Sequence, residues 1–93
     1  MNIEKILEHY YKAKCKHPVF CTAITTQKKD NADTLLGLYR GLADEKKTAE
    51  YIALEELYEA ITAHIDGDRY HAIEECYDAI AVLIRMIEFM EEK

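Results

Sequence analysis

The sequence predicts an all-α fold: an antiparallel helical bundle of about four helices, completed by oligomerisation. The chain has 93 residues with only 3 glycines and 1 proline, too few turn-forming residues for a strand-rich sandwich or barrel. Apolar residues make up 49 % of the chain and recur three and four positions apart, the spacing of one helix face. A chain this short buries roughly 60–65 % of the surface that its unfolded state exposes. We therefore expect a single domain, residues 1–93, that gains stability from a partner subunit.

The first helix is expected over residues 3–14. Asn2 is a suitable N-cap, and the helix must end before Pro18, because the residue that precedes a proline avoids helical geometry. Residues 16–31 are the least regular part of the chain. They are compatible with a short helical turn at about residues 20–24 or with a short extended piece.

The second helix is expected over residues 32–43, with Asn31 or Asp33 as its cap. Gly37 and Gly41 lie four residues apart within it. We interpret this pair of small residues as the place where a neighbouring helix approaches closely.

The last two helices form a hairpin at about residues 48–90. The third helix is expected to start near residue 44 or 48 and to run to residue 64 or 66. Gly67 supplies a C-terminal stop, and Asp68 caps a fourth helix that continues nearly to the end of the chain. A turn this short makes the two helices antiparallel neighbours.

Composition argues against several classes of function. The net charge is −6, whereas proteins that bind nucleic acid usually carry a clustered basic face. The longest apolar run, residues 79–84, is far shorter than the ~20 residues that span a bilayer, so we expect no membrane association. No secretory signal is evident at the start. Three cysteines without a C-x-x-C motif indicate a reducing compartment, and we expect a cytoplasmic protein.

Acidic residues cluster on both helices of the hairpin. The third helix carries Glu55, Glu56 and Glu59, and the fourth carries Glu75 and Asp78. Residues three apart project from one side of a helix, so two such groups can face each other across an antiparallel pair. Converging carboxylates repel unless they are protonated or hold a cation, and an all-oxygen ligand set suits Mg²⁺ or Mn²⁺.

Helical projection separates Glu75 from an ordinary solvated acid. At ~100° per residue, Ala79, Val82 and Met86 lie within about 60° of Glu75, which places this carboxylate in an apolar surface. A charge on a burying face needs a partner, and an ion pair with a lysine or arginine is the alternative to a metal. The acids of the third helix project away from its apolar stripe, which suits a solvated face as well as a site facing a second subunit.

The spacing of these acids resembles the signature of the all-α nucleoside triphosphate pyrophosphohydrolases. This superfamily includes MazG-like proteins, dimeric dUTPases and phosphoribosyl-ATP pyrophosphohydrolase, and its motif is E-E-x-x-E on one helix and E-x-x-D on the next. Here the motif reads Glu55-Glu56-x-x-Glu59, fifteen intervening residues (75 − 59 − 1), then Glu75-x-x-Asp78. The resemblance covers about half of the chain.

The resemblance implies a site and a reaction. It assigns Glu56, Glu59, Glu75 and Asp78 as metal ligands and Glu55 as an accessory carboxylate. It implies bound Mg²⁺, with Mn²⁺ as an alternative, and cleavage of a nucleoside triphosphate or related nucleotide to the monophosphate and pyrophosphate. In such a site the cation lowers the pKa of the attacking water and offsets charge on the leaving group. It also implies a homodimer or homotetramer.

Several groups near the helix ends are candidates for binding the substrate. They are Lys46, Lys47, Arg69 and His71. His71 lies one turn before Glu75, so it is placed to orient that carboxylate, to touch a ligand, or to serve only as an interfacial histidine.

A non-enzymatic interpretation stays open: a helical dimerisation or adaptor module whose acids only keep it soluble. In an adaptor, Glu75 should be paired with a basic side chain or exposed. Redox iron is disfavoured, because no Glu-x-x-His motif of the di-iron bundles occurs.

Overall fold

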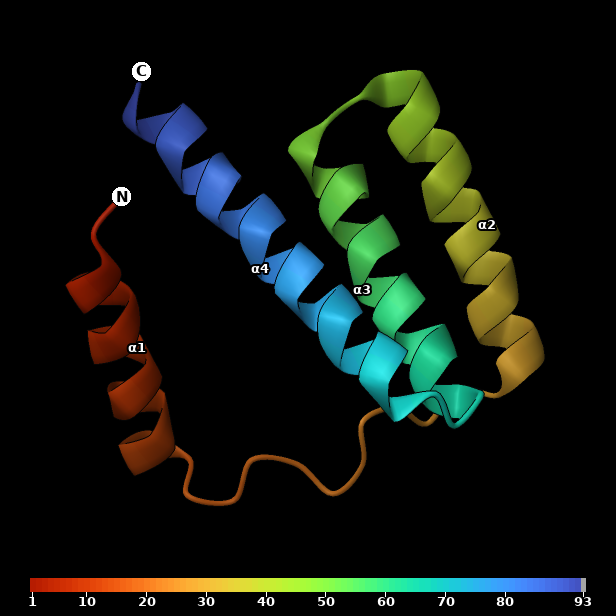
Figure 1. Ribbon diagram of the computed structural model, residues 1–93, viewed down its shortest axis with the longest axis horizontal. Helices are drawn as coiled ribbons and strands as arrows, with labels where there is room; N and C mark the ends of the chain where they lie inside the picture. Colours follow the sequence, from red (N-terminus) through yellow and green to blue (C-terminus); the bar gives the residue numbers. More distant parts are fainter. Residues whose placement is uncertain (93) are drawn as a thin grey trace.

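The computed structural model describes residues 1–92, and these are all-helical, which confirms the predicted fold class. The four helices are α1 (Ile3–Lys16), α2 (Lys29–Lys46), α3 (Ala49–Ile65) and α4 (Arg69–Glu91). Helices α2, α3 and α4 lie side by side, whereas α1 stands apart at the end of an irregular segment (Figure 1). Within the described part of the chain, the helices that pack on each other are α2 with α3 and α3 with α4.

Three of the predicted end signals are confirmed. The side chain of Asn2 caps α1 by accepting a hydrogen bond from the backbone N–H of Lys5 at 3.2 Å. The side chain of Asp68 caps α4 in the same way, accepting from His71 N–H at 3.1 Å. Gly67 has φ +80°, the left-handed conformation that glycine adopts at a helix end. Helix α1 extends two residues beyond the predicted end at residue 14.

Helix α2 is longer than the predicted range 32–43, and the caps expected for it are wrong. Asn31 and Asp33 lie inside the helix. The extra turn is tied down by Lys29, whose ammonium contacts the carboxylates of Asp33 at 3.3 Å and Asp66 at 2.7 Å. Because Asp66 lies at the far end of α3, this start depends on a tertiary contact.

The irregular segment, residues 17–28, forms no helical turn at 20–24. Its last residues are anchored to the bundle. Gln27 donates from Nε2 to the hydroxyl of Tyr58 at 2.9 Å, and its backbone N–H donates to Thr25 Oγ1 at 3.0 Å.

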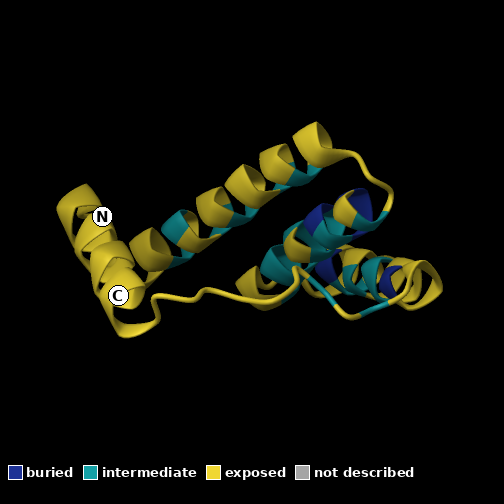
Figure 2. Cartoon of the chain, turned by 90° about the horizontal axis from the view of Figure 1, so that it is seen from below, coloured by how far each residue is buried: buried dark blue, intermediate teal, exposed yellow. Residues whose placement is uncertain are grey.

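Small side chains make up the packed centre of the bundle. The buried apolar residues are Ala32 and Ala43 on α2 and Ala60 and Ala63 on α3. No large side chain among residues 1–92 is fully buried, and α1 is exposed along its whole length (Figure 2). The single chain therefore has a small core for its apolar content. Although α4 has 23 residues, neither it nor any other described helix is apolar enough, over a sufficient length, to cross a membrane.

The interpretation of Gly37 and Gly41 as a close helix approach is wrong for the single chain. A Cβ built on either residue meets no atom within 4 Å, and both residues are exposed. Helix α2 instead faces α3 with alanines, which allow close packing at less conformational cost than glycine.

The substitution Gly67→Ala is expected to lower the free energy of unfolding by about 1 kcal/mol, because a side chain is strained at positive φ. The matched control, Gly37→Ala, is expected to raise it by roughly 0.5–1 kcal/mol, since alanine favours the helix interior and its Cβ meets no atom. Urea unfolding followed by circular dichroism measures both. Equal effects at the two positions would contradict the assigned end of α3.

Candidate metal centre

The two carboxylate motifs face each other across the packed helices α3 and α4. Glu56 on α3 and Glu75 and Asp78 on α4 each offer one carboxylate oxygen, and these oxygens all lie within 4.8 Å of one another. The first two side chains are partly buried, and Asp78 is exposed. The hairpin thus brings together three of the four acids that the resemblance assigns as ligands.

Two oxygens of this cluster are buried without a partner. Glu56 Oε2 and Glu75 Oε2 accept no hydrogen bond from any described residue. A buried acceptor left unsatisfied costs about 1–3 kcal/mol, and more when it is charged. A proton shared between the two carboxylates or a bound cation would satisfy both oxygens. Oxygen-only ligand sets suit hard divalent cations.

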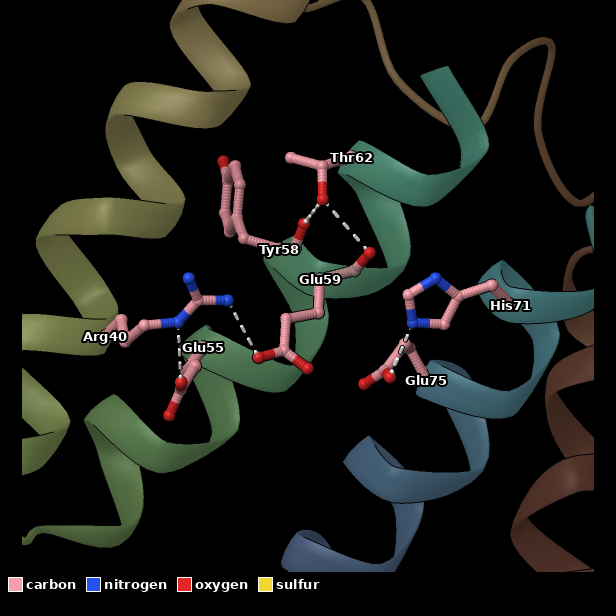
Figure 3. A network of polar contacts seen from close by, with 7 residues as sticks. All are labelled: Arg40, Glu55, Tyr58, Glu59, Thr62, His71 and Glu75. Carbon is pink, nitrogen blue, oxygen red and sulfur yellow. Dashed lines mark hydrogen bonds and ion pairs between the residues drawn. The ribbon is translucent and has the colours of Figure 1, made fainter. Parts of the chain in front are cut away.

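Glu75 is paired with a histidine, and no lysine or arginine within the described range forms an ion pair with it. His71 Nε2 lies 3.0 Å from Glu75 Oε1, and the Glu75 side chain is only 12 % exposed. The other ring nitrogen, Nδ1, lies 3.8 Å from Asp68 Oδ2. With a proton on Nε2, the ring donates to Glu75 and orients it (Figure 3). This contact agrees with one of the three roles considered for His71, the orientation of Glu75.

Glu55 and Glu59 are both held by Arg40 of α2. Arg40 Nε lies 3.2 Å from Glu55 Oε2, and Nη2 lies 3.1 Å from Glu59 Oε1. Figure 3 shows the Glu59 carboxylate between Arg40 and Glu75, while Glu55 points away from the cluster. Sequence reasoning missed Arg40, which pairs with two of the predicted site residues, because an ion pair between helices leaves no spacing pattern in the sequence.

The cluster shifts the titration of its own members. Burial, followed by the nearby carboxylates of Glu75, Glu59 and Asp78, raises the pKa of Glu56 to about 7. The pKa of Glu59 is also raised, again chiefly by burial, with Arg40 acting in the opposite direction. Near neutral pH the cluster therefore retains a proton for part of the time unless a cation replaces it.

The basic residues expected to contact the substrate lie in two separate places, Lys46 and Lys47 at the junction of α2 and α3 and Arg69 at the start of α4. Lys46 pairs with its neighbour Glu45 at 3.5 Å. Lys47 precedes α3, whereas Arg69 opens α4, and these are opposite ends of the hairpin. The structure does not bring the three together at the carboxylates.

A mainly apolar groove adjoins the carboxylates between α3 and α4. Its lining includes Lys47, Ile52, Val82, Arg85, Met86 and Phe89. Ile52 lies one turn before Glu56 and Val82 one turn after Asp78, so the groove starts next to the cluster. Its volume, ≈ 700 Å³, falls within the ~300–1,000 Å³ of small-molecule sites.

Comparisons of the chain with protein-family models, with curated proteins and with solved structures find no match. The basis for a function is therefore the geometry of the carboxylates and the spacing of the motif.

The cation-free protein is expected to lose stability as pH rises from 4.5 to about 7. In this window Glu56 holds its proton in the folded state, whose pKa is about 7, but has lost it in the unfolded chain, with the ordinary value of 4.5. The folded state then binds more protons, so raising the pH favours unfolding.

Thermal unfolding in the presence of a chelator, across this pH range, measures the effect. Glu56→Gln should flatten the pH dependence, and the control Glu74→Gln, at an exposed position on the other side of α4, should leave it unchanged. Parallel curves for the wild type and Glu56→Gln would contradict the assigned shift.

Proposed function

We propose that the protein is a Mg²⁺-dependent nucleotide pyrophosphohydrolase that cleaves a nucleoside triphosphate, or a related nucleotide, to the monophosphate and pyrophosphate. The observation that carries the proposal is the convergence of Glu56, Glu75 and Asp78, with a buried, unpartnered oxygen on each of the first two. The resemblance of the motif to MazG-like pyrophosphohydrolases supports the same reaction class.

The cation would be held by Glu56, Glu75 and Asp78, with Glu59 beside them. When bound, it supplies charge for the phosphates and lowers the pKa of a water; Mn²⁺ has similar ligand preferences. His71 holds the Glu75 carboxylate in place, as groups behind metal ligands do. Arg40 holds Glu59, and its planar guanidinium is the type of group that recognises phosphate oxygens.

The groove beside the carboxylates suits the base of a nucleotide whose phosphates lie at the cation. Its apolar wall, formed in part by Ile52, Val82 and Met86, matches a flat base, and Lys47 and Arg85 add positive charge to the lining. A base in this groove would leave the phosphates near the acidic cluster, because the two features are one helical turn apart.

A non-catalytic dimerisation or adaptor module is the second candidate. It is favoured by the large apolar side chains that remain exposed on α1 and α4. The cation response separates the two candidates, because an adaptor has no use for it. We place the protein in the cytoplasm on either proposal, since all three cysteines are free and free thiols suit a reducing compartment.

Calorimetry is expected to show saturable binding of Mn²⁺ and Mg²⁺ to the wild-type protein near neutral pH. Binding should be lost in Glu75→Gln, which removes a charged ligand, and kept in Glu74→Gln, which removes the same charge from an exposed neighbouring position. Binding should also release protons, because Glu56 must ionise, and this appears as an enthalpy that depends on the buffer.

The same variants are then tested for hydrolysis of a broad panel of nucleoside triphosphates with Mg²⁺. The proposal predicts monophosphate and pyrophosphate in equal amounts, absent in Glu75→Gln. Cation binding that is indifferent to Glu75, both alone and with a non-hydrolysable triphosphate, would refute the proposal and favour the adaptor.

A further inference from the structure

Helix α1 presents an apolar stripe that the described part of its own chain leaves largely exposed. The α1 stripe consists of Ile3, Ile6, Leu7, Tyr10 and Tyr11, which are 38–64 % exposed. No residue of α1 is buried. The α1 segment meets α4 near the N-terminus of α1 and the C-terminal part of α4, where the Met1 amino group lies 3.1 Å from the carboxylate of Glu91 and where Ile6 and Ile87 line a shared pocket. An isolated helix of 14 residues is marginal in water, so α1 needs a partner surface.

Helix α4 carries a second uncovered apolar face. The α4 flank consists of Ile73, Tyr77, Ile80, Leu83 and Ile87, which are 40–64 % exposed. Their spacing of three and four places them on one side of the helix. This side is distinct from the face with Ala72, Glu75, Ala79 and Val82, which is partly buried against α3.

The uncovered area is as large as a stable subunit interface. The chain exposes 7492 Å², whereas a compact monomer of this mass exposes about 5,500 Å². The excess of about 2,000 Å² surpasses the roughly 800 Å² that each partner buries in a standard interface.

Charge is divided between the two parts of the chain that would meet. Residues 1–29 carry six lysines and two glutamates, a net +4, whereas residues 30–93 carry six basic and sixteen acidic residues, a net −10. A basic helix and an acidic bundle attract each other. The opposite charges favour seating α1 on an acidic bundle, and the large uncovered area indicates that this bundle belongs to a second copy of the chain.

We propose that two copies exchange their α1 helices, each seating its α1 stripe on the α4 flank of the other. Within one chain α1 meets α4 only near Ile6 and Ile87, which line a shared pocket, while Leu7, Tyr10 and Tyr11 stay 47–59 % exposed. The contact within one chain therefore leaves most of the stripe uncovered. Residues 17–28 can span up to about 40 Å when extended, enough to reach a neighbour. The exchange is reciprocal, so it closes as a twofold dimer and leaves no unpaired copy of either surface.

Sedimentation of the full chain tests this exchange. The wild type is expected to have twice the chain mass of 10.8 kDa, and Leu7→Glu and Ile80→Glu should each weaken dimerisation at least tenfold. Leu38→Glu is the matched control: Leu38 on α2 is 53 % exposed and Ile80 is 49 % exposed, but Leu38 lies outside both surfaces, so the dimer should persist. A monomeric wild type, or a dimer indifferent to Leu7→Glu, would overturn the proposal.

Mixed crosslinking tests the exchange without relying on a destabilising variant. In a background with serine in place of the three cysteines, one preparation carries Tyr10→Cys and another carries Ile80→Cys. A short thiol crosslinker should join the two preparations to each other. A third preparation carries both substitutions in one chain. If the crosslinker joins residues 10 and 80 only within single chains of this third preparation, at every concentration, the exchange is overturned. The result is independent of the proposed activity, because the carboxylates lie within one chain's hairpin.

Discussion

Repulsion among carboxylates that the fold holds together is the constraint on which the rest of this structure depends. The antiparallel packing of α3 on α4 puts oxygens of Glu56, Glu75 and Asp78 within 4.8 Å of one another. Partial burial strengthens the repulsion, because fewer water molecules screen it. The observed arrangement offsets it through His71 on one side, through Arg40 on the other, and through a raised pKa of Glu56. A bound cation would offset the same repulsion.

A small number of contacts holds together the helices that impose this constraint. Alanines at the α2–α3 contact allow the backbones to approach, and Lys29 ties the start of α2 to the end of α3 through Asp66. Arg40 joins α2 to the acids of α3, so α2 also helps to position the site. Among residues 1–92 the scaffold has no core of large side chains, and many large apolar residues of α1 and α4 remain exposed.

How much could be predicted from the sequence differs between local and tertiary features. Asn2, Gly67 and Asp68 mark helix ends by local chemistry, and each lies where it was expected. The position of Glu75 in an apolar surface also followed from helix geometry alone. The start of α2 and the role of Arg40 did not, because both depend on ion pairs with α3, far away in the sequence. The prediction of a close helix approach at Gly37 and Gly41 was wrong for a related reason. Spacing shows that two residues share a face of a helix, but it does not show which element that face contacts.

The most direct test of the metal site is the location of bound Mn²⁺ by paramagnetic broadening in the NMR spectrum of the protein. A substoichiometric addition should first remove the amide signals around Glu56, Glu75 and Asp78, while those of α1 and of the Asp66–Asp68 turn remain. Broadening centred on that turn or on the acidic residues near the C-terminus, or spread evenly over the surface, would contradict a cation site between α3 and α4.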